Sequence, residues 1–431
     1  MNFLKKQSPV RIISLGFALV ILIGSVLLSL PCSIRDGVTL RYIDALYMST
    51  SAVCVTGLLT VDAGDTFTPL GQFFLGMLIQ VGGLGVTAVG TGVILAMGKK
   101  INLKARNLIR EAGNLDSGKG VIRFIRLVFL TTVTFELAGA ALSFLVFRKN
   151  FPPLKAAGVS LFHSVASFNN SGFDILGGGQ NLIPYQDDVL LNLVTCALVI
   201  FGGIGFLVIR EVIAKRFRWK KLSMHAKVVL FMSLVLTAVG TVLLKLTEDI
   251  TWMGAFFTSV SARTAGFSTF PLGSFSGAGL LTVIVLMVIG ASPGSTGGGI
   301  KTTTCYVLFE GIRSSATNTS EKAFRYAVPA DAFRKAAVIT LLAIGIVLSG
   351  TYILVILEPG VPFLDALFEM SSAFGTAGLS TGISAGLCDA AKILTILIMF
   401  IGRLGPLTIA SLWYFNKGER VSYPEGNIAI G

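Results

Sequence analysis

The sequence has few charged residues, only two histidines and only five cysteines. Asp, Glu, Lys and Arg make up 13% of the 431 residues, about half of what a soluble globular protein carries. The cysteines (Cys32, Cys54, Cys196, Cys305 and Cys388) show no metal-binding spacing, and we expect free thiols that pack as small apolar residues. No cluster of His, Cys or carboxylate residues has catalytic spacing, which argues against a membrane enzyme. The sequence therefore disfavours a soluble protein, a Cys/His metal site and an enzyme.

Apolar residues are abundant instead. They make up 53% of the chain, and the mean hydropathy of +0.80 is typical of an integral membrane protein. Apolar runs long enough to cross a bilayer as a helix, which takes about 20 residues, predict eight spans. These lie at 12–30, 70–97, 122–147, 189–209, 228–247, 278–300, 336–357 and 392–414. An even number of spans places both termini on the same side of the membrane.

The net charge of +13 is distributed unevenly between the two sides of the membrane. Lys and Arg concentrate in residues 1–11, 98–126, 210–227 and 311–335 and in the C-terminal tail with Lys417 and Arg420. The positive-inside rule places these segments and both termini in the cytoplasm, so the charge does not indicate nucleic-acid binding. Acidic residues occupy the other side and would concentrate cations there, unless they are ordinary solvated loop charges. These acids are Asp36, Asp44, Asp62, Asp65, Asp174, Asp187, Asp188, Glu248, Asp249, Glu358, Asp365, Glu369 and Asp389.

One short motif occurs four times. It reads SAVCVTGL at 51–58, SFNNSGF at 167–173, SARTAGF at 261–267 and SAFGTAGL at 372–379. An apolar segment too short to cross the membrane precedes each copy, at 41–50, 154–166, 250–260 and 361–371. Segments of 10 to 14 residues are typical of re-entrant structure. Each is therefore a candidate pore helix that enters the membrane without crossing it.

A second, glycine-rich motif follows in each next span, at 82–85, 202–205, 290–294 and 402–405. Two motifs that recur four times in the same order indicate a tandem unit of span, pore helix, loop and span. We expect an all-α polytopic membrane protein with eight transmembrane helices and four re-entrant pore loops around a pseudo-fourfold pore. The repeats are predicted at 1–97, 98–212, 213–312 and 313–431.

The four loops have the composition of a cation filter. Irregular backbone at membrane depth must be buried in protein or line a water-filled cavity, and rings of carbonyls there replace the hydration shell of a monovalent cation. Glycine permits the required backbone, and the carboxyl ends of the pore helices favour a cation. Alternatively, these are structural glycines of another transporter. The candidate filter residues are Val55, Thr56, Gly57, Asn170, Ser171, Gly172, Thr264, Ala265, Gly266, Thr376, Ala377 and Gly378. The neighbouring Asn169 leaves the register of the second filter strand open.

The third repeat departs from the others at 290–304, GASPGSTGGGIKTTT. Pro293 and five glycines predict a broken helix at mid-membrane, and we expect loop 291–300 to be an intramembrane gate. Its candidate residues are Gly294, Ser295, Thr296, Gly297, Gly298, Gly299 and Lys301. The stretch nearly matches a phosphate-binding loop, but Ile300 interrupts the motif and no strand–loop–helix context surrounds it.

Arg403 occupies the position that Gly83, Gly203 and Ala291 hold in the other repeats. A charge within a span is a functional-site hypothesis by default. We expect an electrostatic barrier or a partner of the gate loop, with a structural salt bridge to Glu136 as the alternative. Arg263 is expected to point away from the ion path and brace its loop. The histidines, His163 and His225, are expected to be structural.

These repeats resemble the Trk/Ktr/HKT superfamily of potassium transporters over essentially the whole chain, and most of all the bacterial Ktr membrane subunit. The resemblance implies K+ uptake with no resident cofactor, a gate loop in the third repeat and an arginine in the last span. It also implies a homodimer in the lipid of the bacterial cytoplasmic membrane, controlled by a cytosolic nucleotide-binding ring subunit. Glycine at all four filter positions favours K+ over Na+; whether Na+ is co-transported or activates stays open. The alternative is a sodium- or proton-coupled secondary transporter of another solute, which predicts inverted repeats.

Overall fold

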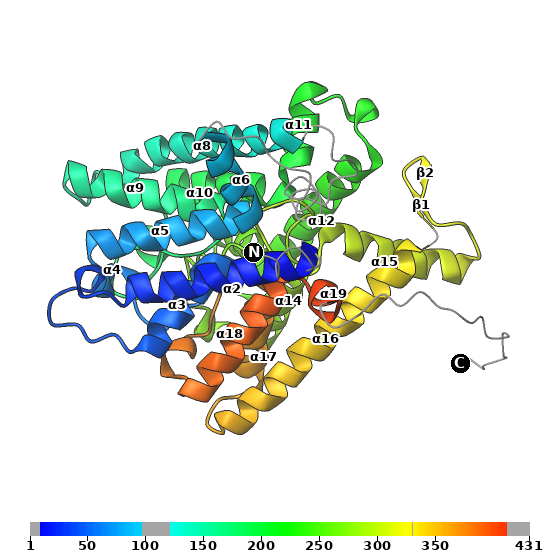
Figure 1. The fold of residues 1–431 in the computed structure, drawn as a ribbon. Coiled ribbons are helices and arrows are strands. Elements are labelled where there is room, and N and C mark those ends of the chain that lie inside the picture. Colours follow the sequence, from blue (N-terminus) through cyan, green and yellow to red (C-terminus); the bar gives the residue numbers. More distant parts are fainter. Residues whose placement is uncertain (1–8, 97–120, 330, 412–431) are drawn as a thin grey trace, which may run out of the picture.

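The computed structural model describes residues 9–96, 121–329 and 331–411. Three basic segments of the sequence lie wholly or mostly outside the described residues. They are residues 1–8, most of 98–126, and the C-terminal tail with Lys417 and Arg420. The described residues are almost entirely helical, and the same succession of elements occurs four times along the chain (Figure 1).

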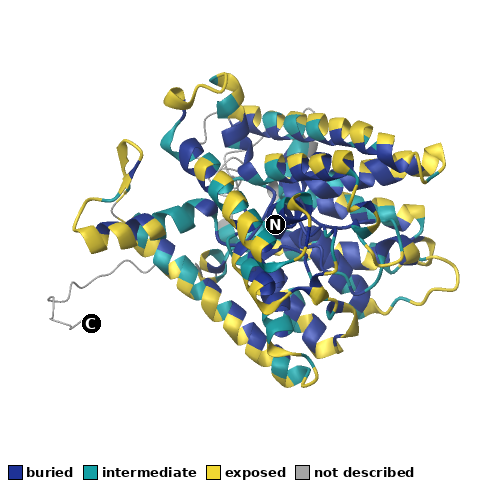
Figure 2. Ribbon diagram, turned by 180° about the vertical axis from the view of Figure 1, so that it is seen from behind, coloured by how far each residue is buried: buried dark blue, intermediate teal, exposed yellow. Residues whose placement is uncertain are grey.

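Each repeat begins with a long helix that is apolar enough to cross a membrane. These helices are α2 (Pro9–Leu28), α8 (Val121–Phe147), α12 (Met224–Thr247) and α16 (Ala332–Leu357). Their outward faces carry exposed apolar side chains, for example Leu130 at 65%, Leu234 at 70% and Leu341 at 70% exposure. Figure 2 shows these exposed faces around a buried centre. Such an apolar surface suits lipid, whose tails are as apolar as leucine.

A shorter pore helix follows in each repeat: α3 (Tyr42–Cys54), α9 (Pro153–Phe168), α13 (Trp252–Ala262) and α17 (Phe363–Gly375). The four predicted segments are helical, but each helix continues beyond its predicted end and into the repeated motif. Small residues such as Ala52 and Ala373 are fully buried there, and they let the helix continue while it packs closely against its neighbours. In the first and last repeats the helix stops where Val55 and Thr376 adopt the left-handed conformation.

The second span of three repeats is interrupted by one glycine. The pairs are α5 (Pro69–Leu84) with α6 (Val86–Ala96), α10 (Val189–Ile204) with α11 (Phe206–Ala214), and α18 (Asp389–Leu404) with α19 (Pro406–Ser411). Within the described residues, the spans predicted at 70–97, 189–209 and 392–414 are therefore helical but broken at one glycine, which hydropathy does not reveal. Gly85, Gly205 and Gly405 have φ of 87°, 92° and 90°, which side chains other than hydrogen disfavour. The axis bends by 98° between α10 and α11.

The third repeat has a longer interruption, as its proline and glycines predict. Helix α14 (Gly277–Val288) ends, residues 289–301 carry no helix, and α15 (Thr302–Thr317) then begins. A bridge between Ile289 and Ile300 brings the two ends of this segment together. A hairpin of β1 (Lys322–Ala323) and β2 (Tyr326–Ala327) follows α15. The remaining elements are α4 (Ala63–Thr66) and the short 3-10 helices η1 (Pro31–Ser33), η2 (Ile183–Tyr185), η3 (Trp219–Lys221), η4 (Leu272–Ser274) and η5 (Ser384–Gly386).

The repeats close into a ring, because the second helix of each packs on the pore helix of the next. Helix α5 contacts α9, α10 contacts α13, α14 contacts α17, and α18 returns to contact α3. Lys392 of α18 and Asp44 of α3 reinforce the last contact through a buried ion pair of 2.6 Å. Asp44, which the sequence assigns to the outer side, is neither a solvated loop charge nor an unpaired one.

Candidate functional site: a ring of four glycines and the loop beneath it

The four glycines of the repeated motif lie side by side at the centre of the molecule. Their φ angles are 95°, 68°, 80° and 80° for Gly57, Gly172, Gly266 and Gly378. A Cβ atom on Gly57 would lie 2.2 Å from the Ser171 oxygen, and one on Gly378 would lie 2.1 Å from the Thr56 oxygen. A Cβ on Gly172 would meet Gly266, and one on Gly266 would meet Ala377, at 2.7 and 2.8 Å. Each glycine thus packs against the next repeat, and the ring has no room for a side chain.

The residue two positions before each glycine also has a positive φ: 56° at Val55, 57° at Asn170, 75° at Thr264 and 49° at Thr376. β-Branched residues rarely adopt this conformation, and backbone strain of this kind concentrates at functional sites. The shared conformation places Asn170, Ser171 and Gly172 in line with their counterparts, although Asn169 and Asn170 make this strand the least typical in sequence.

Backbone hydrogen bonds hold each filter strand against its own pore helix. The Thr56, Ser171 and Ala377 amides donate to Ser51, Ala166 and Ser372 over 2.7, 2.9 and 2.9 Å. In the third repeat the Ala265 amide donates to Ser261 over 2.9 Å, one residue closer in sequence. The strand therefore turns back from the helix end in the same way four times, with a small variation in the third repeat.

The hydroxyl groups predicted near the filter are all fully buried. Thr264 Oγ1 contacts Asn170 over 3.2 Å in either orientation of the asparagine amide, and Ser171 Oγ donates to Ala166 over 3.3 Å. Thr376 Oγ1 accepts from the Gly298 amide over 3.1 Å. Thr56 Oγ1 has no hydrogen-bond partner among the described residues.

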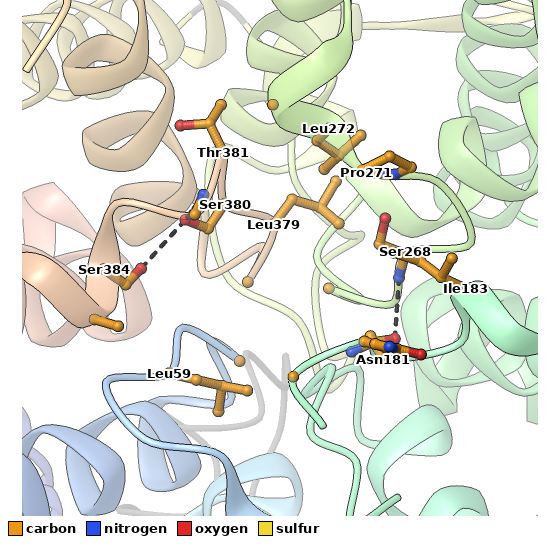
Figure 3. Close-up of a pocket in the computed structure, with 18 of the residues that line it drawn as sticks. Leu59, Asn181, Ile183, Ser268, Pro271, Leu272, Leu379, Ser380, Thr381 and Ser384 are labelled. Atoms are coloured by element: carbon orange, nitrogen blue, oxygen red, sulfur yellow. Dashed lines mark hydrogen bonds between the residues drawn. The ribbon is translucent and has the colours of Figure 1, made fainter. Parts of the chain in front are cut away.

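A cavity of 490 Å³ opens on one side of the glycine ring. All four repeats line it, through residues within 57–62, 174–183, 266–274 and 378–385. Figure 3 shows Asn181 turned toward Ser268, and its amide donates to the Gly172 oxygen over 3.2 Å while its oxygen accepts from the Ser268 amide over 3.1 Å. Asp62 and Asp174 also line the cavity. Sequence reasoning did not identify this cavity; the acids after the first two motifs were its only signal.

Loop 291–300 packs against Thr264 and Thr376, which precede the ring glycines of their repeats by two residues. A Cβ atom on Gly297 would lie 2.2 Å from Thr264 Oγ1, and one on Gly298 would lie 2.4 Å from Thr376 Oγ1. The Lys301 ammonium donates back to the carbonyls of Gly297 and Gly298 over 2.9 and 3.3 Å. The glycines of the loop are thus needed for close approach to the filter strands.

The loop is also tied to the second repeat. The amides of Ser292 and Thr296 donate to the oxygens of Gly203 and Gly202 over 3.0 and 3.2 Å. In return, the Phe206 amide donates to the Gly294 oxygen over 3.1 Å. The loop therefore lies at the break between α10 and α11, where the oxygens of Gly202 and Gly203 and the amide of Phe206 bind it.

Arg403 joins this loop to the first repeat. Its guanidinium donates to the Thr296 oxygen, to Gly82 over 2.5 Å and to Gly83 over 3.3 Å. Glu136 instead accepts from the Asn169 amide over 3.0 Å, so the proposed salt bridge between Glu136 and Arg403 is wrong. Arg403 thus lies beside the loop, as its sequence position suggested.

The other singled-out residues have structural contacts. Arg263 donates to the Ser233 oxygen over 3.1 Å and so braces its helix end, and His163 contacts Thr195 over 2.9 Å. The cysteines are free, but Cys32 and Cys388 are exposed rather than packed inside. Within 9–96, 121–329 and 331–411, no group of His, Cys, Asp and Glu has the arrangement of a metal site.

Comparisons with known proteins agree with this arrangement. The family model of the TrkH cation transport proteins matches residues 12–416. The Ktr system potassium uptake protein B of Bacillus subtilis is 36% identical over 98% of this chain and 97% of its own. The potassium/sodium uptake protein NtpJ of Enterococcus hirae is 35% identical over 99% and 98%.

A solved structure has the same fold. The potassium transporter TrkH from Vibrio parahaemolyticus superposes with a TM-score of 0.75 at 19% identity, over 95% of this chain and 86% of its own. Four pore-loop repeats, a closed ring of glycines and full-length similarity lead to one conclusion. The chain belongs to the TrkH family of cation transport proteins.

Proposed function

We propose that this protein takes up K+ across the bacterial cytoplasmic membrane through the ring formed by Gly57, Gly172, Gly266 and Gly378. The observation that carries the proposal is the closure of this ring, in which the four repeats meet backbone to backbone. Two relatives are named for potassium uptake and for potassium/sodium uptake, which supports the choice of ion. The family is one of cation transporters, and no chemical step is required of this chain.

The proposed path of the ion runs from the cavity to the glycine ring. Cations enter the 490 Å³ cavity, where Asp62 and Asp174 provide negative charge. Carbonyl groups of the filter strands, including Val55, Thr56 and their counterparts, then replace the hydration shell. The carboxyl ends of four pore helices add a negative potential at the same place. Glycine at all four positions keeps the four sides equal, which favours K+.

The loop 291–300 is proposed as the gate. It lies under the filter and is held by the second repeat and by Arg403. Movement of the loop away from Thr264 and Thr376 opens the path, and Arg403 stabilises the closed position. Lys301 binds the loop's own carbonyls, which helps the loop keep its shape.

The assembly is proposed from the family. A homodimer, each protomer with its own pore, is embedded in membrane lipid with both termini in the cytoplasm. A cytosolic ring of nucleotide-binding subunits controls the gate, and Na+ is co-transported or activates. Within each chain, the repeats are divided at 97, 212 and 312. The four equivalent repeats around one axis favour this function over a secondary transporter with inverted repeats.

Uptake of radioactive rubidium by vesicles that contain the purified protein tests the proposal, because Rb+ mimics K+. We expect uptake that unlabelled K+ inhibits at lower concentration than Na+ does. Vesicles without protein provide the background. If Rb+ neither enters the vesicles nor stabilises the protein against heat, the potassium function is wrong.

A further inference from the structure

The fourth pore helix carries a carboxyl group that the filter and the gate do not use. Glu369 of α17 is one of the acids that the sequence assigns to the outer side, and it is 0% exposed. It accepts hydrogen bonds from Ser380 over 2.8 Å and from Ser384. Both serines line the 490 Å³ cavity, and Figure 3 shows them side by side. Glu369 thus lies directly behind the wall of the ion entrance.

The charge of this carboxyl group is not balanced by a basic residue. Among the described residues, none of the ion pairs involves Glu369, and the nearby Asp365 adds a second negative charge. A buried carboxylate costs several kcal/mol unless it is paired. Asp44 on the neighbouring pore helix shows the usual solution, since the buried Lys392 ammonium balances it. Glu369 has no such partner among the described residues, so a bound cation must balance its charge or a proton must remove it.

A further buried hydroxyl faces the same place. Tyr47 of α3 is 0% exposed, and its phenol group lies close enough to Ser384 and Glu369 to interact with both. Its oxygen nevertheless has no hydrogen-bond partner of good geometry among the described residues. Buried hydroxyl groups normally have a partner. The Tyr47 oxygen is therefore the one atom of this cluster without a hydrogen-bond partner among the described residues, since both Glu369 oxygens accept from serines.

The cluster has more oxygen lone pairs than hydrogen atoms to fill them. Ser384 Oγ contacts both Glu369 and Ser380, the latter over 3.3 Å, but a hydroxyl group donates only one hydrogen. Carboxylate and hydroxyl oxygens are the ligands of hard cations. A single carboxylate balances one positive charge. Of the two monovalent cations in the names of the relatives, K+ and Na+, the smaller Na+ suits a site made of only four side chains.

We propose that Glu369, Ser380, Ser384 and Tyr47 form a Na+ site beside the entrance to the filter, separate from the path of the transported ion. The bound Na+ holds the first and fourth repeats together and fixes the segment after Gly378. This inference rests on the proposed function only for its effect on transport. The site itself is defined by the four side chains.

Heat denaturation of the purified protein at saturating K+ tests Na+ binding without transport, with choline as the replacement cation. K+ then occupies the filter, so a rise in Tm with Na+ reports a different site. We expect Glu369→Gln to require about tenfold more Na+ or to lose the response, since a site's stabilisation follows its occupancy. Tyr47→Phe should raise the required Na+ by a smaller factor. Glu310→Gln is the matched control, because Glu310 is also buried but is paired with Arg313 over 2.5 Å.

Several outcomes overturn the proposal. An unchanged Na+ response in Glu369→Gln contradicts it, and so does the absence of any response in the unmodified protein, which would indicate that Glu369 holds a proton. If Glu369→Gln does not fold, Tyr47→Phe and Ser384→Ala decide by the same criterion. Rubidium uptake is measured on the same preparations, so a failure of transport with an intact Na+ response would reject the proposed function and leave the site standing.

Discussion

The glycine ring and the layer beneath it differ in symmetry. In the ring, all four repeats present the same backbone conformation, with positive φ at the glycine and at the residue two positions earlier. Beneath it, three repeats have a single glycine break, while the third has the non-helical segment 289–301 and the fourth contributes Arg403. Selection of an ion by size requires equal sides, whereas a gate requires one element that moves independently. We therefore propose that selectivity and gating reside in separate layers.

Deletion of residues 294–299 should break this asymmetry most strongly. The deletion removes the loop that lies under Thr264 and Thr376. We expect Rb+ flux without any regulatory partner to rise about tenfold, a barrier lower by ~1.4 kcal/mol. Unchanged flux would mean that the loop does not gate. The preference for K+ over Na+ should persist, because the ring is intact.

Substitution of Arg403 should have a smaller effect on flux. Arg403→Gln removes the bonds to Thr296 and Gly82 but leaves the ties between the loop and the second repeat. We expect flux to rise about threefold, since a charged hydrogen bond contributes about 1.5–3 kcal/mol and part of this is recovered elsewhere. Flux assays on Arg263→Gln provide a control, because Arg263 contacts Ser233 and not the loop. Equal effects of the two substitutions would argue against a specific role of Arg403.

The glycine breaks offer a still finer test. Gly85 and Gly205 have nearly equal backbone angles, with φ of 87° and 92° and ψ of 132° and 140°, so alanine imposes a similar backbone strain, about 1–3 kcal/mol at each site. A Cβ on Gly205 would lie 2.6 Å from the Pro293 oxygen, whereas one on Gly85 has open space. We expect Gly205→Ala to alter flux by about twofold more than Gly85→Ala, and to lower Tm further because of the added contact. Indistinguishable flux would show that the contact with the loop has no effect on gating.

The repeated motifs made most of the architecture predictable. The four pore helices and the break at Pro293 could be predicted because they depend on residues that are close together in the sequence. The breaks at Gly85, Gly205 and Gly405 were missed because hydropathy continues through them, and a glycine inside a helix does not reveal its φ. The pore helices were also predicted to end too early, because the burial of Ala52 and Ala373 depends on the adjacent repeats.

Contacts between distant residues could not be predicted from one sequence. Lys392 and Asp44 are 348 residues apart, and each resembles a surface charge in its local context. Glu369 also resembles a surface charge in its local context, but it is fully buried and the later residues Ser380 and Ser384 fold back onto it. The sequence allows Arg403 to be an electrostatic barrier, a partner of the loop or a partner of Glu136, and its contact with the Thr296 oxygen depends on the packing of α18.

The central claim is that the glycine ring selects K+, and the K+/Na+ permeability ratio of Gly57→Ser tests it most directly. A Cβ at position 57 would lie 2.2 Å from the Ser171 oxygen, so the ring must open on one side. Gly37→Ser is the matched control, because its φ of 80° imposes similar strain with no atom within 4 Å. We expect the ratio to fall about tenfold, or ~1.4 kcal/mol of discrimination, in Gly57→Ser and to persist in Gly37→Ser. An unaltered ratio in Gly57→Ser would contradict the account.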